Sequence, residues 1–147
     1  MNKVLFSSDC KEWGTPIDLF LDLDREFHFN VDLCASKQRH LCDIYFTKDD
    51  SCLDHEIFFS SIFCNPPYGR DMYQFIKKCY ELSFFNDVVL LVPARTDTKW
   101  FHEFIYHKCD EIRFLKGRLK FVGTSFGSAP FPSMICIFKK KVLDNFR

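Results

Sequence analysis

The sequence predicts an α/β fold in which helices cover both faces of a mostly parallel central sheet. The run DVVLLVPA (87–94) is continuously apolar, as in a strand that is buried on both faces. Short apolar runs of this kind alternate along the chain with longer segments whose apolar residues recur at helical spacing. Strands that alternate with helices pack as βαβ units, so we expect a three-layer sandwich with the sheet in the middle.

The first part of the chain contains one expected helix and two expected short strands. Apolar residues recur at helical spacing after the Thr15-Pro16 pair, with Thr15 suited to the N-cap and Pro16 to the first helical position. The run FHFNVDLCA (27–35) then predicts a strand with Asp32 at or near its carboxyl end. In the polar stretch that follows, we expect one short strand over 44–46.

The second part continues the alternation. A buried strand is expected over SSIFCN (60–65), followed by a helix with five apolar positions at spacings of three and four: Met72, Phe75, Ile76, Cys79 and Leu82. After the 87–94 strand, the segment 96–109 predicts a helix. The segments 111–117 and 133–140 predict the last two strands.

Several functional candidates directly follow expected strands. Asp32 follows the first strand, the segment 65–68 follows the 60–65 strand, and the segment 93–95 ends the 87–94 strand. In open α/β sheets, ligands bind outside the carboxyl ends of the strands. We therefore expect these residues to share one ligand-binding rim.

Length and composition predict one globular domain. The 147 residues are 47% hydrophobic and 27% charged, which is typical of a chain that folds around its own core. We expect a single domain over 1–147, with no separate target-recognition domain. The first residues contain no apolar run of signal-peptide length, and no segment approaches the roughly 20 apolar residues of a membrane span. These features predict a cytoplasmic protein with no membrane partner.

Charge and cysteine content bear on three properties: nucleic-acid binding, disulfide bonds and metal binding. The formal net charge is zero, so binding to nucleic acid would need a local basic face. Four of the eight cysteines lie in apolar runs, as reduced buried thiols do: Cys34, Cys64, Cys79 and Cys136. One group of residues has the right chemistry for a metal but a spacing that fits no standard zinc pattern: His40, Cys42, Cys52 and His55. We expect no metal.

The tetrapeptide Asn65-Pro66-Pro67-Tyr68 places an amide and a stiff backbone directly after an expected strand. The Asn65 Oδ1 atom and the Pro66 carbonyl would accept both hydrogens of a planar NH2 group, while Tyr68 would stack on its plane. Such a grip aims the nitrogen lone pair at an electrophile, which predicts methyl transfer to nitrogen. A proline-rich turn that only closes the strand is the alternative.

Five segments between residues 13 and 121 resemble motifs of one enzyme family in the same order, and the match as a whole runs from about Trp13 to Phe138. The family is the phage-type Dam family of DNA N6-adenine methyltransferases. The segments are Trp13-Gly14-Thr15-Pro16, Asp32-Leu33-Cys34-Ala35, Asn65-Pro66-Pro67-Tyr68, Pro93-Ala94-Arg95-Thr96-Asp97-Thr98-Lys99-Trp100 and Gly117-Arg118-Leu119-Lys120-Phe121.

This resemblance implies a Rossmann-like methyltransferase fold, with S-adenosyl-methionine as methyl donor and adenine N6 in double-stranded DNA as acceptor. It implies a catalytic role for Asn65, Pro66, Pro67 and Tyr68. The donor site implied by the resemblance comprises Trp13, Thr15, Pro16, Asp32, Ala35, Asp50 and Asn65. The chain departs from many methyltransferases in one respect, because no glycine-rich loop follows Asp32.

An adenine inside a duplex would have to be flipped out to reach the Asn65 loop. Four basic residues are candidates for contacts with DNA phosphates: Arg95, Lys99, Arg118 and Lys120. The resemblance also implies a phage- or prophage-encoded protein that acts in the bacterial host. We expect it to act as a monomer or homodimer.

Three other functions remain open at this stage. An N5-glutamine methyltransferase acting on a protein would grip the same planar NH2 group, as would an enzyme that methylates cytosine N4. A catalytically dead DNA-binding module would keep the fold without the chemistry. Binding of S-adenosyl-methionine separates the dead module from the enzymes.

Overall fold

A six-stranded mixed sheet forms the centre of the protein in a computed structural model that describes residues 13–125 and 127–142. The strands lie in the order β2-β1-β3-β4-β6-β5. Their bounds are Val31–Asp32 for β1, Ile44–Tyr45 for β2, Ser61–Cys64 for β3, Asp87–Pro93 for β4, Glu111–Phe114 for β5 and Ser133–Phe138 for β6. Each of these strands lies within a segment that the sequence predicts as a strand.

Strands β2, β1, β3 and β4 are mutually parallel, whereas β6 is antiparallel to both of its neighbours. The prediction of a mostly parallel α/β sheet is therefore confirmed. The reversal of β6 has a simple cause. The carboxyl ends of β4 and β5 lie at the same end of the sheet. Because no helix in the described residues between β5 and β6 returns the chain to the other end, the 115–132 loop starts and finishes there, and β6 runs back in the opposite direction.

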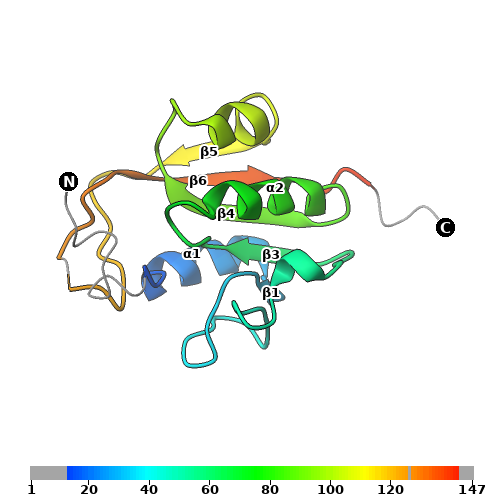
Figure 1. The fold of residues 1–147 in the computed structure, drawn as a ribbon, viewed down its shortest axis with the longest axis horizontal. Helices are drawn as coiled ribbons and strands as arrows, with labels where there is room; N and C mark the ends of the chain where they lie inside the picture. Colours follow the sequence, from blue (N-terminus) through cyan, green and yellow to red (C-terminus); the bar gives the residue numbers. More distant parts are fainter. Residues whose placement is uncertain (1–12, 126, 143–147) are drawn as a thin grey trace.

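Helices cover the two faces of the sheet (Figure 1). On one face, α1 (Ile17–Phe27) buries Phe20 and Leu23 against side chains such as Phe63 of β3. On the other face, α2 (Met72–Leu82) packs together with a π-helical turn, η3 (Phe101–Ile105). A short 3-10 helix, η2 (Cys52–Asp54), precedes β3.

The central strand β4 shows why these layers form. Its alternate residues belong to different cores: Val88 and Leu90 pack towards α2, whereas Val89 and Leu91 pack towards α1. All four side chains have no exposed surface. Side chains alternate across a strand, so a continuously apolar strand requires cover on both faces.

Two predicted helices differ from expectation. The first begins at Ile17, with Pro16 at the N-cap and no side-chain cap, so the expected N-cap role of Thr15 is wrong. The Thr15 hydroxyl instead accepts a hydrogen bond from the Asn65 amide. The predicted 96–109 helix is reduced to two helical residues followed by the π-helical turn η3. This turn packs its large aromatic residues, Phe101 and Phe104, against the α2 core.

No helix in the 13–125 and 127–142 parts of the chain has the length and apolar character needed to cross a membrane. The expectation that the chain starts without a signal peptide concerns residues 1–12, which lie outside the described residues.

Candidate methyltransferase site

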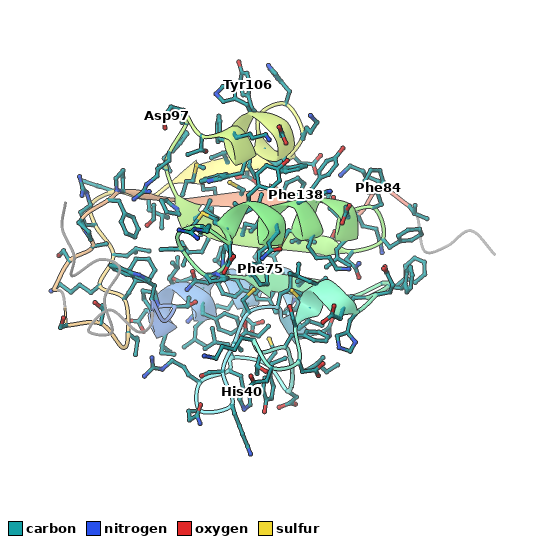
Figure 2. The ribbon with its side chains drawn as sticks, in the orientation of Figure 1. His40, Phe75, Phe84, Asp97, Tyr106 and Phe138 are labelled. Atoms are coloured by element: carbon teal, nitrogen blue, oxygen red, sulfur yellow. The ribbon has the colours of Figure 1, made fainter. Side chains whose placement is uncertain are left out.

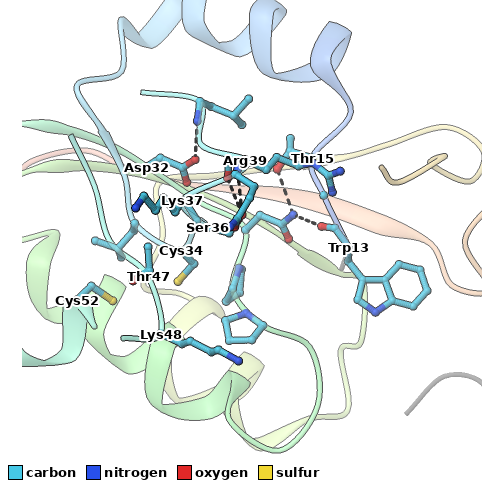
Figure 3. A pocket seen from close by; sticks show the side chains of 18 of the residues that line it. Trp13, Thr15, Asp32, Cys34, Ser36, Lys37, Arg39, Thr47, Lys48 and Cys52 are labelled. Carbon is cyan, nitrogen blue, oxygen red and sulfur yellow. Dashed lines mark hydrogen bonds between the residues drawn. The ribbon is translucent and has the colours of Figure 1, made fainter. Parts of the chain in front are cut away.

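A cavity of about 790 Å³ lies at the carboxyl ends of β1 and β3 (Figure 3). This volume falls within the range of roughly 300–1,000 Å³ that small-molecule sites occupy. Most of its wall comes from three parts of the chain: the segment before α1, the segment after β1, and the Asn65 loop after β3. Further lining comes from residues 47–49, Cys52, Phe75 and Val122. Asp32 and the segment 65–68 thus share a rim as expected, around a hollow large enough for a cofactor, whereas none of the residues 93–95 lines it.

Asp32 forms the floor at the end of β1 and is almost fully buried. Its Oδ2 atom accepts a hydrogen bond of 2.9 Å from the Leu41 amide. Burial raises the pKa of this carboxyl to about 6, although the hydrogen bond from Leu41 works in the opposite direction. A buried carboxylate at a cavity wall is suited to accept hydrogen bonds from a polar ligand, and more so above this pKa.

Asn65 directly follows β3, and the nitrogen of its side-chain amide has hydrogen-bond partners whereas the oxygen has none in the described parts of the chain. The amide nitrogen donates to the Trp13 carbonyl oxygen at 2.5 Å and to the Thr15 hydroxyl at 3.1 Å, as the dashed lines in Figure 3 show. The Oδ1 atom is buried and has no hydrogen-bond partner among the described residues. A buried acceptor without a partner is costly and rare in folded proteins. Because Asn65 lines the cavity, this unused acceptor points to a ligand that donates a hydrogen bond.

Tyr68 belongs to a cluster of four aromatic rings beside the cavity. Its ring stacks against Trp13 at a centroid distance of 6.0 Å and meets Phe121 and Phe131 edge to face. The Tyr68 hydroxyl is buried without a partner among the described residues, and burial raises its pKa. The neighbouring Pro66 is buried, whereas Pro67 is exposed. The cluster fixes the Tyr68 ring without using the hydroxyl.

A bridge between Gly14 and Val122 connects the start of the described chain to the 115–132 loop. Both residues line the cavity, so this contact closes part of its wall. A side chain at position 14 would place its Cβ atom only 2.7 Å from the Val122 carbonyl oxygen. Glycine is therefore required here for close approach between two backbone segments.

Cysteines form an unexpected part of the cavity wall. Cys34 lies 3.7 Å from Cys64, measured between sulfur atoms, and lines the cavity together with Cys52. Hydrogen bonds with the Cys52 and Cys64 thiols lower the pKa of Cys34 to about 5. The seven cysteines that the structure describes are all unpaired. Within the same residues, no group of three or more His, Cys, Asp or Glu side chains could hold a metal.

The predicted donor-site residues are only partly brought together. Trp13, Thr15, Asp32, Ala35 and Asn65 all line the cavity. Pro16 is absent from its lining and acts as the N-cap of α1. Asp50 is also absent from the lining, and its carboxylate pairs with His55 at 2.7 Å.

Four cavity residues have no distinguishing signal in the sequence: Lys37, Lys48, Asp49 and Phe75. The first three lie in polar loops that have no regular pattern. The fourth lies on α2 (Figure 2) and has the spacing of a core residue. Asp49 lines the cavity beside the residue at which the sequence-based prediction placed the acidic donor contact.

None of the four predicted phosphate contacts lines the cavity. The Arg95 guanidinium packs over the Phe131 ring at 5.6 Å, which places it next to the aromatic cluster. Arg118 and Lys120 are exposed in the 115–132 loop at the rim. Lys99 packs over Tyr73 and pairs with Glu103 at 3.8 Å.

Comparison with known proteins adds a family context to this geometry. A model of the family described as DNA N-6-adenine-methyltransferase (Dam) matches residues 4–142. A DNA N-6-adenine-methyltransferase of Escherichia phage T1 is 29% identical over 94 residues, which cover 62% of this chain and 39% of that protein. The matched part thus spans about two fifths of the length of this relative.

Two solved structures resemble this one loosely. One is described as a methyltransferase complexed with SAH; it has a TM-score of 0.43 and 13% identity, covering 69% of this chain and 25% of that chain. The other is a methyltransferase structure from Thermoplasma acidophilum, with a TM-score of 0.40 and 11% identity, covering 86% of this chain and 54% of that chain. Both TM-scores are low.

Proposed function

Because the chain belongs to the DNA N-6-adenine-methyltransferase (Dam) family, we propose that it transfers a methyl group from S-adenosyl-methionine to the N6 amino group of adenine in double-stranded DNA. The buried Oδ1 atom of Asn65, which has no partner among the described residues, carries this proposal, because Asn65 lines the cavity. Every polar function of the Asn65 side chain except this acceptor already has a partner. The site therefore selects a group that donates a hydrogen bond, as an amino group does.

The Asn65 loop acts on the acceptor nitrogen by orientation. Asn65 Oδ1 and the Pro66 carbonyl accept the two hydrogens of the amino group, which turns the nitrogen lone pair towards the methyl donor. The stiff Pro66-Pro67 backbone keeps that carbonyl in place. Placing two reactants in a near-attack geometry supplies much of the rate in reactions of this kind. The methylated nitrogen is acidic and releases its proton to water, so no side chain has to act as general base.

The cavity fits the donor in size and in chemistry. Asp32 offers a carboxylate acceptor, Lys37 and Lys48 offer positive charge for the donor's carboxylate, and Asp49 offers an acceptor for its amino or hydroxyl groups. Trp13 and Phe75 provide apolar walls. When bound, S-adenosyl-methionine supplies a methyl group on a positively charged sulfur, which is the electrophile. The residues of this chain hold it between the end of β1 and the Asn65 loop.

DNA reaches the cavity at the rim formed by the 115–132 loop. The target adenine is flipped out of the duplex, at a cost of a few kcal/mol that contacts with the Asn65 loop offset. Tyr68 stacks on the flipped base, and Arg95, Arg118 and Lys120 contact the flanking phosphates. The phage T1 relative supports a phage or prophage origin and action inside the bacterial host.

The first experiment measures transfer of labelled methyl groups from S-adenosyl-methionine to unmethylated double-stranded DNA, followed by nucleoside analysis. The Asn65→Ala variant serves as the control that lacks the acceptor oxygen. Label in N6-methyladenine with the wild type, and none with the control, supports the proposal. Label in N4-methylcytosine would show that the acceptor is cytosine N4 and not adenine N6. If DNA stays unlabelled while the donor binds, a protein acceptor is tested next; without donor binding, the chain is a dead module.

A further inference from the structure

We infer that Thr15 is a positioning residue, whose hydroxyl acts with the Trp13 carbonyl to anchor the Asn65 amide nitrogen and so leaves Oδ1 to accept from the methyl acceptor. This inference rests on the proposed function and assigns Thr15 a role other than donor binding. The oxygen and the NH2 group of an amide are similar in shape, so hydrogen bonds to the nitrogen are needed to leave the oxygen available as an acceptor.

The two hydrogen bonds of the amide nitrogen determine its orientation. The Trp13 carbonyl can only accept a hydrogen bond, so the atom 2.5 Å away from it must be the nitrogen of Asn65. The Thr15 hydroxyl accepts the second amide hydrogen at 3.1 Å. Both hydrogens are thus used within the protein, and the oxygen is left as the free function of the side chain.

The opposite orientation would disable the site. If the amide turned by 180°, its oxygen would meet the Trp13 carbonyl oxygen, and its two N–H groups would face the amino group to be methylated. Donor would then meet donor, and the acceptor nitrogen would lose its alignment. The Trp13 main-chain carbonyl selects the orientation, because a hydroxyl could bond either end of the amide. The Thr15 hydroxyl adds the second anchor, which limits motion of the amide and is the part of this clamp that depends on a side chain.

The start of α1 provides an independent sign that the Thr15 hydroxyl has been diverted from its ordinary task. The sequence suits Thr15 to the N-cap, where a cap contributes about 1 kcal/mol, but in the structure Pro16 occupies the N-cap. Here α1 has no side-chain cap, and Thr15 is buried with its hydroxyl turned to Asn65. The contact joins residues that are 50 positions apart in the sequence, so helix formation alone does not require it.

The test compares Thr15→Val, which keeps the shape and removes the hydroxyl, with Thr15→Ser, which keeps the hydroxyl. Steady-state methylation of DNA gives kcat and KM, and calorimetry gives the affinity for S-adenosyl-methionine. We expect Thr15→Val to lower kcat about tenfold, as the loss of one hydrogen bond in the transition state predicts. KM for DNA and donor affinity should stay within about twofold, and Thr15→Ser should retain wild-type kcat.

The alternatives give different results. If Thr15→Val weakens donor affinity and leaves kcat at saturating donor unchanged, Thr15 is a donor contact and the inference is wrong. Equal kcat in all three proteins also overturns it. If the wild type methylates no DNA, the proposed function fails first. NMR of the Asn65 side-chain amide then tests the hydrogen bond to Thr15 without any need for activity. Its two N–H signals should shift between wild type and Thr15→Val, and unchanged signals would refute the clamp. Should Thr15→Val not fold, Thr15→Ala replaces it in every measurement.

Discussion

Gly14 and Val122 exchange two main-chain hydrogen bonds, of 2.7 and 2.8 Å, and so join the segment before α1 to the loop before β6. The same short segment contains the Trp13 carbonyl and the Thr15 hydroxyl that hold Asn65. The bridge therefore links the loop that carries Arg118 and Lys120 to the segment that holds Asn65.

Substitution of Gly14 by alanine should disturb both the bridge and the Asn65 clamp. The added Cβ atom would lie 2.7 Å from the Val122 carbonyl oxygen, so one backbone segment has to move. We expect a loss of about 1–3 kcal/mol in the free energy of unfolding, typical of overpacking, and a lower methylation rate. Urea unfolding and the methylation assay measure the two effects.

The matched control for this change is Gly127→Ala in the same loop. A Cβ atom at Gly127 meets nothing within 4 Å, so stability and activity should both stay close to wild type. If Gly14→Ala behaves like this control, the close approach of the two backbones is unimportant.

Tyr68 is expected to act through its ring and not through its hydroxyl. The hydroxyl is buried without a partner among the described residues, so Tyr68→Phe should leave stability unchanged or raise it by up to about 1 kcal/mol. Its methylation rate should stay within a few-fold of wild type, whereas Tyr68→Ala should abolish turnover. Circular dichroism checks that both variants are folded. Equal inactivity of the two would assign the hydroxyl a direct role in the reaction.

Asp32 should make both stability and donor binding depend on pH. Burial raises its pKa from 3.8 to about 6, so the folded protein binds more protons than the unfolded chain between roughly pH 4 and 6. The stability contributed by Asp32 is fully present below about pH 3.8 and is lost as the pH rises through about 6. A shift of this size corresponds to roughly 2–3 kcal/mol.

The Asp32→Asn variant tests this linkage. Its amide oxygen can still accept from Leu41, but it has no proton to release. We expect the stability difference between wild type and variant to change over pH 4–6, with the variant at least as stable at pH 8. Its donor affinity should be lower at pH 8, where the wild-type carboxylate is charged. Parallel stability curves over this range would contradict the assignment.

The rim residues Arg118 and Lys120 should contribute to DNA binding through phosphate contacts. Each alanine substitution is expected to weaken binding about equally for all sequences and to reduce the slope of log K against log salt by about 1. Lys139→Ala is the control, because Lys139 follows Phe138, which pairs with Val88 at the opposite end of the sheet. Titration of a labelled duplex at several salt concentrations measures the slope; an equal effect of the control would rule out a local contact.

Much of this architecture follows from short-range patterns in the sequence. The apolar runs around Phe63 and Leu90 predict buried strands, and the spacing around Ile76 predicts α2, because periodic apolar residues specify an element locally. The rule that ligands bind at the carboxyl ends of parallel strands then predicts from the sequence alone that Asp32 and Asn65 share one rim.

The tertiary structure alone decided how these residues are used. Asn65 and Trp13 are 52 positions apart, and whether Thr15 caps a helix or holds an amide depends on which group lies beside it after folding. The reversal of β6 likewise depends on the path of the 115–132 loop. Element type is encoded in neighbouring residues, whereas hydrogen-bond partners are chosen among groups that only the packed chain brings together.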